Sequence, residues 1–174
     1  MLNYRISKYN PSNSYENYHF YNDEWSSFQD VGEKMDSVVL TLDEYKKVET
    51  AYIDTIMDLM NSNGISNLTI NEIEKNNQDI ELKIEDEISA NEVEALYKKL
   101  RNGLTIEKDT IEKVCRLILR GYLWCKLEYK KNFYLHFGYD YYMYVGFPNG
   151  GNDIMREVRN RGLYFNEMKS PYRK

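Results

Sequence analysis

The sequence has few of the residues and segments that mark metal-binding, membrane-spanning or nucleic-acid-binding proteins. Its 174 residues include two Cys and two His, which lie far apart and give no metal-ligand spacing. No apolar run comes near the roughly 18 residues that a membrane span requires. The formal net charge of -5 disfavours a phosphate backbone as partner, because binding it requires clustered Lys and Arg. We therefore expect no metal, no cofactor, no membrane association and no nucleic-acid partner.

Motifs of nucleotide-binding proteins and serine hydrolases are also missing. Gly150 and Gly151 lie outside any phosphate-binding pattern, and no G-x-S-x-G sequence occurs. The first ten residues, MLNYRISKYN, do not have the pattern of a signal peptide, so we expect a cytoplasmic protein. In that compartment Cys115 and Cys125, each among apolar neighbours, are expected to be reduced and buried.

What the sequence does have is an aromatic stretch, Tyr122–Gly146, that predicts three successive β-strands. Alternate residues share a face of a strand, and one face of the first strand is entirely apolar or aromatic: Leu123, Cys125, Leu127 and Tyr129. Short polar breaks separate the strands and require antiparallel neighbours. The opposite face is also unusually aromatic, with Tyr122, Trp124, Tyr134 and His136. We expect helices to cover and bury this face as well, and a partner that covers it is the alternative.

Helix and strand signals flank this stretch on both sides. Capping boxes at residues 41–44 and 89–92 predict the starts of two helices, and Asp109 and Asn152 predict two more. Further strands are expected at residues 2–8, 68–73, 80–84 and 163–168, and a polar tail at 169–174. Because runs of adjacent strands are typical of α+β proteins, we predict that class, in a single domain of residues 1–174. The expected architecture is an antiparallel sheet centred on residues 122–146, with about four helices packed against it.

Residues 23–32 combine acidic and aromatic side chains. Trp25, Phe28 and Val31 recur at roughly helical spacing, and Gly32 suits the end of a single turn. We interpret this segment as a turn whose aromatic side chains close the edge of the core. A loop that contacts a partner is the alternative.

Catalytic interpretations of the sequence rest on His136. It lies in a predicted strand beside Tyr134 and near Asp140, residue types that serve as acids and bases. A thiol nucleophile formed by Cys115 with His136 is less favoured, because Cys115 occupies the apolar stripe of a helix, where burial raises the pKa of a thiol. We therefore expect a half-buried structural histidine and a protein that is not an enzyme.

One region of the sequence is strongly acidic. Between Ile70 and Tyr97 there are nine carboxylates and two Lys, whereas the chain from Arg156 onward is net positive. An acidic patch steers a basic partner, and Tyr, of which the chain has seventeen, is favoured at interfaces. A solvated face that keeps the protein soluble is the alternative. The residues predicted to bind a protein partner are Glu81, Glu85, Asp86, Glu87, Tyr134, Asp140 and Tyr142.

Three stretches of the sequence resemble a family of small, uncharacterised bacterial proteins. They are YRISKYNP at residues 4–11, DEWSSFQDVG at 23–32, and LWCK with HFGYDYYMY at 123–126 and 136–144. They follow the same order in that family and span most of the chain. The family has no assigned catalytic motif, so the resemblance implies no functional residue.

In size, acidity and aromatic content, the chain also resembles the immunity proteins that neutralise polymorphic or contact-dependent toxins. The leading hypothesis is therefore a cytoplasmic immunity protein that binds a basic toxin domain, such as a nuclease, and occludes its active site. Two alternatives remain open: a phage-type inhibitor of a bacterial defence system, and a small enzyme that uses His136.

Overall fold

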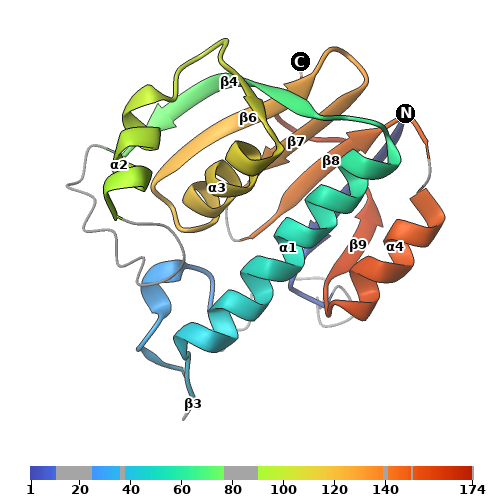
Figure 1. Cartoon of the computed structure of the whole chain (residues 1–174). Helices are drawn as coiled ribbons and strands as arrows, with labels where there is room; N and C mark the ends of the chain where they lie inside the picture. Colours follow the sequence, from blue (N-terminus) through green and yellow to red (C-terminus); the bar gives the residue numbers. More distant parts are fainter. Residues whose placement is uncertain (11–24, 36–37, 77–89, 139–140, 150, 174) are drawn as a thin grey trace.

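The computed structural model describes residues 1–10, 25–35, 38–76, 90–138, 141–149 and 151–173. Within these residues, nine strands and four α-helices form (Figure 1). Seven of the strands make one sheet, in the order β5 (Thr105–Glu107), β4 (Asn67–Lys75), β6 (Leu123–Tyr129), β7 (Phe133–Phe137), β8 (Met143–Phe147), β1 (Leu2–Ser7) and β9 (Tyr164–Glu167). The prediction of an α+β fold with an antiparallel sheet is confirmed.

The predicted aromatic stretch forms the middle of this sheet. β6, β7 and β8 are joined in sequence as antiparallel neighbours, and Leu127, Leu135 and Val145 lie opposite one another across them. The first strand, β1, pairs with β8 on one side and with β9 on the other, so both ends of the chain meet in the sheet. On the far side, β4 joins β6 to the short edge strand β5.

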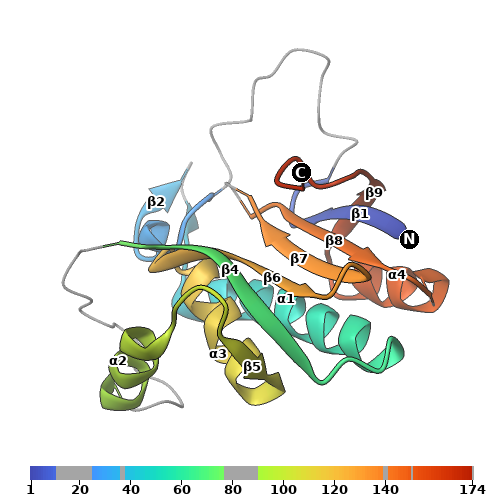
Figure 2. The same cartoon turned by 90° about the horizontal axis from the view of Figure 1, so that it is seen from above.

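The helices lie on one side of the sheet, as the view from above shows (Figure 2). They are α1 (Leu42–Ser62), α2 (Ala90–Lys99), α3 (Lys108–Leu119) and α4 (Gly151–Asn160). The longest, α1, begins at the predicted capping box, in which the Glu44 N–H donates to Thr41 Oγ1 at 3.2 Å and the Thr41 N–H donates to Glu44 Oε2 at 2.9 Å. These bonds satisfy backbone donors that the first turn of a helix leaves open.

The main core lies between these helices and the sheet. The apolar stripe of α1 is fully buried at Tyr52, Ile56 and Leu59, and it faces the sheet residues Leu127 and Leu135, which are also fully buried. Stripes of this kind and alternating strands bury apolar area, which is the main favourable term in folding.

The interpretation of residues 23–32 as a turn that closes the core edge is confirmed for the described part, residues 25–32. A 3-10 turn, η2 (Phe28–Asp30), is capped by Ser27, and the rings of Trp25 and Phe28 pack on Tyr45 of α1 with centroids 5.5 and 4.8 Å apart. A two-stranded sheet of β2 (Lys34–Met35) and β3 (Val38–Val39) then leads into α1.

Two local predictions differ from the structure. The third helix begins at Lys108, with Glu107 as its N-cap residue, so that Asp109 lies in the first turn and is not the cap. The reason is tertiary, because Thr105–Glu107 pairs with β4 and the helix starts directly where this strand ends. The strand predicted at residues 80–84 and the cap at Ser89 lie outside the described residues.

Candidate functional site

The face of the sheet opposite the helices carries a cluster of polar and aromatic side chains. Strand alternation places one set of residues on this face, called the second face below: Trp124, Lys126, Glu128, Tyr134, His136 and Tyr144. The register sets Lys126 opposite His136 and Glu128 opposite Tyr134. Side chains that are opposite in an antiparallel pair lie within contact distance, so β6 and β7 assemble the cluster directly.

His136 is the centre of the cluster and is fully buried. Its Nδ1 lies 2.8 Å from Ser170 Oγ and its Nε2 lies 3.2 Å from Glu128 Oε1, while its ring stacks on Tyr134 with centroids 4.6 Å apart. Burial lowers the pKa of His136 below its ordinary 6.5, although the nearby Glu128 carboxylate opposes this shift. The imidazole is therefore neutral at pH 7, and the expectation of a half-buried histidine understates its burial.

A β-bulge in β4 extends the cluster toward the edge of the sheet. The register between β4 and β6 shifts between Asn71 and Glu74, and Glu72 has a left-handed φ of 50°. The Glu72 carboxylate lies 2.7 Å from Lys126 Nζ, whose side chain is 7% exposed. Asn71 donates its side-chain N–H to Glu128 at 2.6 Å. The bulge thus supplies the counter-charge for a buried lysine and positions Glu128 beside His136.

Ser170, His136 and Glu128 have the order of groups found in a nucleophilic triad. Ser170 is 5% exposed, however, and its Oγ accepts the Tyr172 N–H at 3.2 Å as well as facing His136. The Ser170 N–H in turn donates to the Tyr134 hydroxyl at 3.4 Å. In this arrangement the hydroxyl holds a turn of the C-terminal segment against the sheet, and chemistry at Ser170 would require that segment to move.

The C-terminal segment is therefore more than the polar tail that the sequence predicts. Ser170 is buried, and the Tyr172 ring packs against Trp124 and Tyr144 with centroids 5.5 and 5.9 Å apart. Tyr134 and His136 are buried, as expected, but the expectation that helices cover this face is wrong, because the helices lie on the other side of the sheet (Figure 2). The C-terminal segment of the same chain, on the side away from the helices, provides part of this cover (Figure 2).

The predicted partner-binding residues fall into three groups. Glu81, Glu85, Asp86, Glu87 and Asp140 lie outside the described residues. Tyr134 is 3% exposed and bonded through its hydroxyl to Asn3 Oδ1 at 2.9 Å, so it is an interior residue and is not available as a surface anchor. Tyr142 is partly exposed, and the Arg5 guanidinium lies 4.7 Å from its ring centroid.

The described ends of the acidic region lie side by side. Lys75 Nζ at the end of β4 donates to the Tyr97 carbonyl of α2 at 2.6 Å, and the Tyr97 hydroxyl donates to the Asn76 carbonyl at 2.9 Å. The carboxylates described in this region are exposed: Glu72, Glu74, Glu92 and Glu94. Residues 70–76 and 90–97 therefore lie next to each other, and each contributes two exposed carboxylates.

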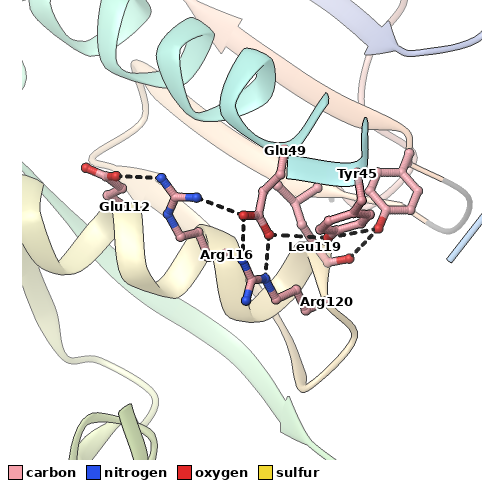
Figure 3. A network of polar contacts seen from close by, with 7 residues as sticks. Tyr45, Glu49, Glu112, Arg116, Leu119 and Arg120 are labelled. Atoms are coloured by element: carbon pink, nitrogen blue, oxygen red, sulfur yellow. Dashed lines mark hydrogen bonds and ion pairs between the residues drawn. The ribbon is translucent and has the colours of Figure 1, made fainter. Parts of the chain in front are cut away.

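A second polar network, on the helix side of the sheet, was not predicted from the sequence (Figure 3). Glu49 of α1 is fully buried and accepts two bonds from Arg120, at 2.7 and 2.8 Å, and one from Arg116 at 2.8 Å. The Tyr45 hydroxyl lies 3.3 Å from the same carboxylate and 3.1 Å from the Tyr141 hydroxyl, which donates its proton to the Leu119 carbonyl at 2.8 Å. The sequence feature that could have predicted this network is Glu49, a carboxylate among the apolar residues of α1.

The pKa values in this network follow from burial and neighbouring charge. Burial raises the pKa of Tyr45 and of Tyr141 far above the ordinary value, so both phenols stay neutral. Burial opposes the charge of Arg116, but bonds to Glu112 and Glu49 raise its pKa overall. The network joins α1, α3 and the segment before β8 through fully paired groups, which is a structural role.

The cysteines are buried, as predicted. Cys115 and Cys125 are both free thiols with no exposed surface, and burial raises the pKa of Cys125 to about 12 and that of Cys115 well above 9.0. A thiol of this kind is inert, which agrees with the sequence-based argument against a Cys115 nucleophile. Within the described ranges, no group of three or more His, Cys, Asp or Glu is placed to hold a metal ion.

Helices long and apolar enough to cross a membrane are absent from the part of the chain that the structure describes. Comparisons of the chain with protein-family models, with curated proteins and with solved structures found no match.

Proposed function

We propose that this chain is a non-enzymatic binding protein whose acidic surface docks on a basic protein, and that it acts as an immunity protein against a cognate bacterial toxin. The observation that carries the proposal is the exposed group of carboxylates on β4 and α2. These elements flank residues 77–89, which add five carboxylates and one lysine in sequence. Charge of one sign on one part of a surface steers an oppositely charged partner and raises its association rate.

Lysines lie among these carboxylates, and two of them form ion pairs there: Lys126 with Glu72, and Lys98 of α2 with Glu94. Lys75 Nζ lies on the Tyr97 carbonyl and 4.8 Å from the Tyr97 ring centroid. Lys126 lies almost entirely beneath the sheet surface, against Glu72. The charge surplus that supports the proposal therefore lies in the sequence of the whole region, where residues 70–97 hold nine carboxylates and two lysines.

The residues with potential for catalysis support the same proposal. His136, Ser170, Cys115 and Cys125 are all buried in this structure, and the polar atoms of His136 and Ser170 bond to each other and to neighbouring groups. Each has a structural explanation that requires no substrate. A binding role that uses the exposed carboxylates leaves these bonds intact.

The proposal is tested by protection of cells. A toxin encoded beside this gene in its host is expressed alone, with the wild-type chain, or with the variant E81K/E85K/D86K/E87K. We expect the wild-type chain to restore growth and the variant to lose most of this protection. A matched variant, E33K/D54K/E107K/E167K, reverses four exposed carboxylates elsewhere and should protect like the wild type, because the net charge changes by the same amount.

Three outcomes would count against the proposal or redirect it. Equal protection by both variants would remove the acidic surface from the mechanism. Failure of the wild-type chain to protect against any toxin encoded beside it would contradict the immunity role. Protection of an infecting phage from a host defence system would instead favour an inhibitor of that system.

A further inference from the structure

The second face holds a tyrosine side chain in an aromatic groove. Tyr172 lies against Trp124 and Tyr144 in edge-on geometry, with interplanar angles of 62° and 72°. Its hydroxyl passes so close to Gly138 that a Cβ there would lie 3.3 Å from it. Two aromatic rings and a glycine therefore surround the Tyr172 ring, and this contact site is called the groove below. Aromatic pairs in this geometry contribute energy beyond their buried area.

The residues on either side of Tyr172 are also recognised by side chains of the sheet. Ser170 bonds to His136 on one side of the groove. Arg173 places its guanidinium 5.2 Å from the Tyr134 ring centroid and donates to the Lys131 carbonyl at 3.3 Å. The tyrosine of this segment thus lies between two aromatic rings. The basic residue that follows it lies against a third ring and a carbonyl oxygen, both of which suit a cation.

This segment is held by side chains and not by the strand ladder. Among described residues, the last backbone-to-backbone bond that joins it to the sheet runs from the Met168 N–H to the Asn3 carbonyl at 3.1 Å. Beyond Met168, the Arg173 N–H donates to the Ser170 carbonyl at 3.3 Å, which closes a turn within the segment itself. Within the described residues, none of the sheet's strand pairings therefore includes residues 169–173.

We propose that the second face is a peptide-binding groove for a segment in which tyrosine precedes a basic residue, and that residues 169–173 occupy it in cis. A segment of another protein with the same chemistry takes the groove by displacing this one. A tethered ligand competes at an effective concentration of the order of millimolar, so the groove opens only to a segment that binds well. The inference rests on the geometry of the groove and does not depend on the identity of the toxin.

The test uses the full chain and a labelled peptide with the sequence of residues 168–174, MKSPYRK. Fluorescence anisotropy measures its binding to the wild-type chain and to the variant Y172A, in which the tethered competitor lacks its ring. We expect the peptide to bind Y172A roughly tenfold or more tightly than the wild type, because removal of the ring weakens cis occupancy. The control Y164A truncates a half-buried tyrosine of β9 and should bind the peptide like the wild type.

A scrambled peptide of the same composition separates the groove from general attraction to an acidic protein. Equal binding of the scrambled and native peptides, or equal binding to Y172A and wild type, would overturn the proposal. Hydrogen exchange of the unmodified chain tests it without any variant. The Ser170 and Tyr172 amides should exchange much faster than those of β7, and exchange at the same rate as β7 would show that the segment leaves only on global unfolding.

Discussion

At the scale of single residues, His136 shows how burial decides the role of a side chain. The sequence places it where an acid-base catalyst is conceivable, and the structure encloses it between Glu128 and Ser170. Lys126 and Arg173 add positive charge nearby, and together with burial they favour the neutral ring. The imidazole then works as a fixed hydrogen-bonding group that joins β6 and β7 to the C-terminal segment.

The lowered pKa of His136 predicts how stability depends on pH. The unfolded chain, in which the histidine has its ordinary pKa of about 6.5, binds more protons than the folded chain just below that pH. The free energy of unfolding should therefore fall as the pH drops below about 6.5, and H136N should lack this part of the fall. Urea denaturation of both proteins at a series of pH values from about 7.5 to about 5 measures this difference in the free energy of unfolding. Parallel profiles would contradict the account.

Gly146 predicts a packing constraint on the second face. A Cβ on this residue would lie 2.0 Å from Cε1 of Tyr134, whose ring is fixed by its stack on His136 and by its bond to Asn3. We expect G146A to lower the free energy of unfolding by roughly 1–3 kcal/mol, because the ring must leave its place.

A double-mutant cycle identifies the cause of this loss. A Y134A background removes the three atoms nearest to the added methyl group, all of the Tyr134 ring, so the cost of G146A should fall sharply. An unchanged cost in that background would mean that the backbone of β8, and not the Tyr134 ring, rejects the alanine.

At the scale of elements, the contact between α1 and α3 depends on one buried carboxylate. Glu49 is the shared partner of Arg116 and Arg120, and the Arg120 side chain is 4% exposed. Phe28 of the η2 turn lies 5.2 Å from the Arg120 guanidinium and extends the packing to the N-terminal segment. Loss of the carboxylate removes the charge that Glu49 places against the buried Arg120 guanidinium.

E49A should therefore destabilise the fold by roughly 3–5 kcal/mol, the cost of breaking a buried ion pair from one side. E112A is the matched control. The Glu112 side chain is 43% exposed, and it pairs with Arg116 but not with the buried Arg120. Its loss should cost no more than about 1 kcal/mol. Guanidinium denaturation of the two variants checks this, and similar losses for both would show that the Glu49 network is not what holds α1 on α3.

The elements that the sequence predicted well are those with local signals. The box at Thr41 and Glu44 marks the start of α1, and alternation in residues 122–146 predicts the strands β6, β7 and β8. The features that it missed depend on contacts between distant residues. β5 exists through its pairing with β4, and the burial of Ser170 depends on His136, 34 residues earlier in the chain.

The candidate site was harder to predict than the fold for the same reason. Tyr134 and Tyr142 both lie in an aromatic stretch, and sequence alone does not separate the buried ring from the partly exposed one. The C-terminal segment reads as polar because Lys169, Arg173 and Lys174 dominate its composition. Its burial follows from Ser170 and Tyr172, whose partners are set by the register of the sheet.

At the scale of the whole molecule, the described charges divide between interior pairs and surface groups. Glu49, Arg120 and Lys126 are buried and neutralised by partners, and these pairs contribute to packing. The surplus of carboxylates that gives the net charge of -5 is concentrated between residues 70 and 97. In the proposed function, we therefore assign the long-range attraction for a basic partner to that region.

The most direct test of this assignment is the association rate with the purified toxin, measured by surface plasmon resonance at several salt concentrations. The wild type should associate fast at low salt and more slowly as salt screens the charges, while E81K/E85K/D86K/E87K should associate slowly at every concentration. The matched variant E33K/D54K/E107K/E167K should behave like the wild type. Identical rates and salt dependence for all three proteins would contradict the account.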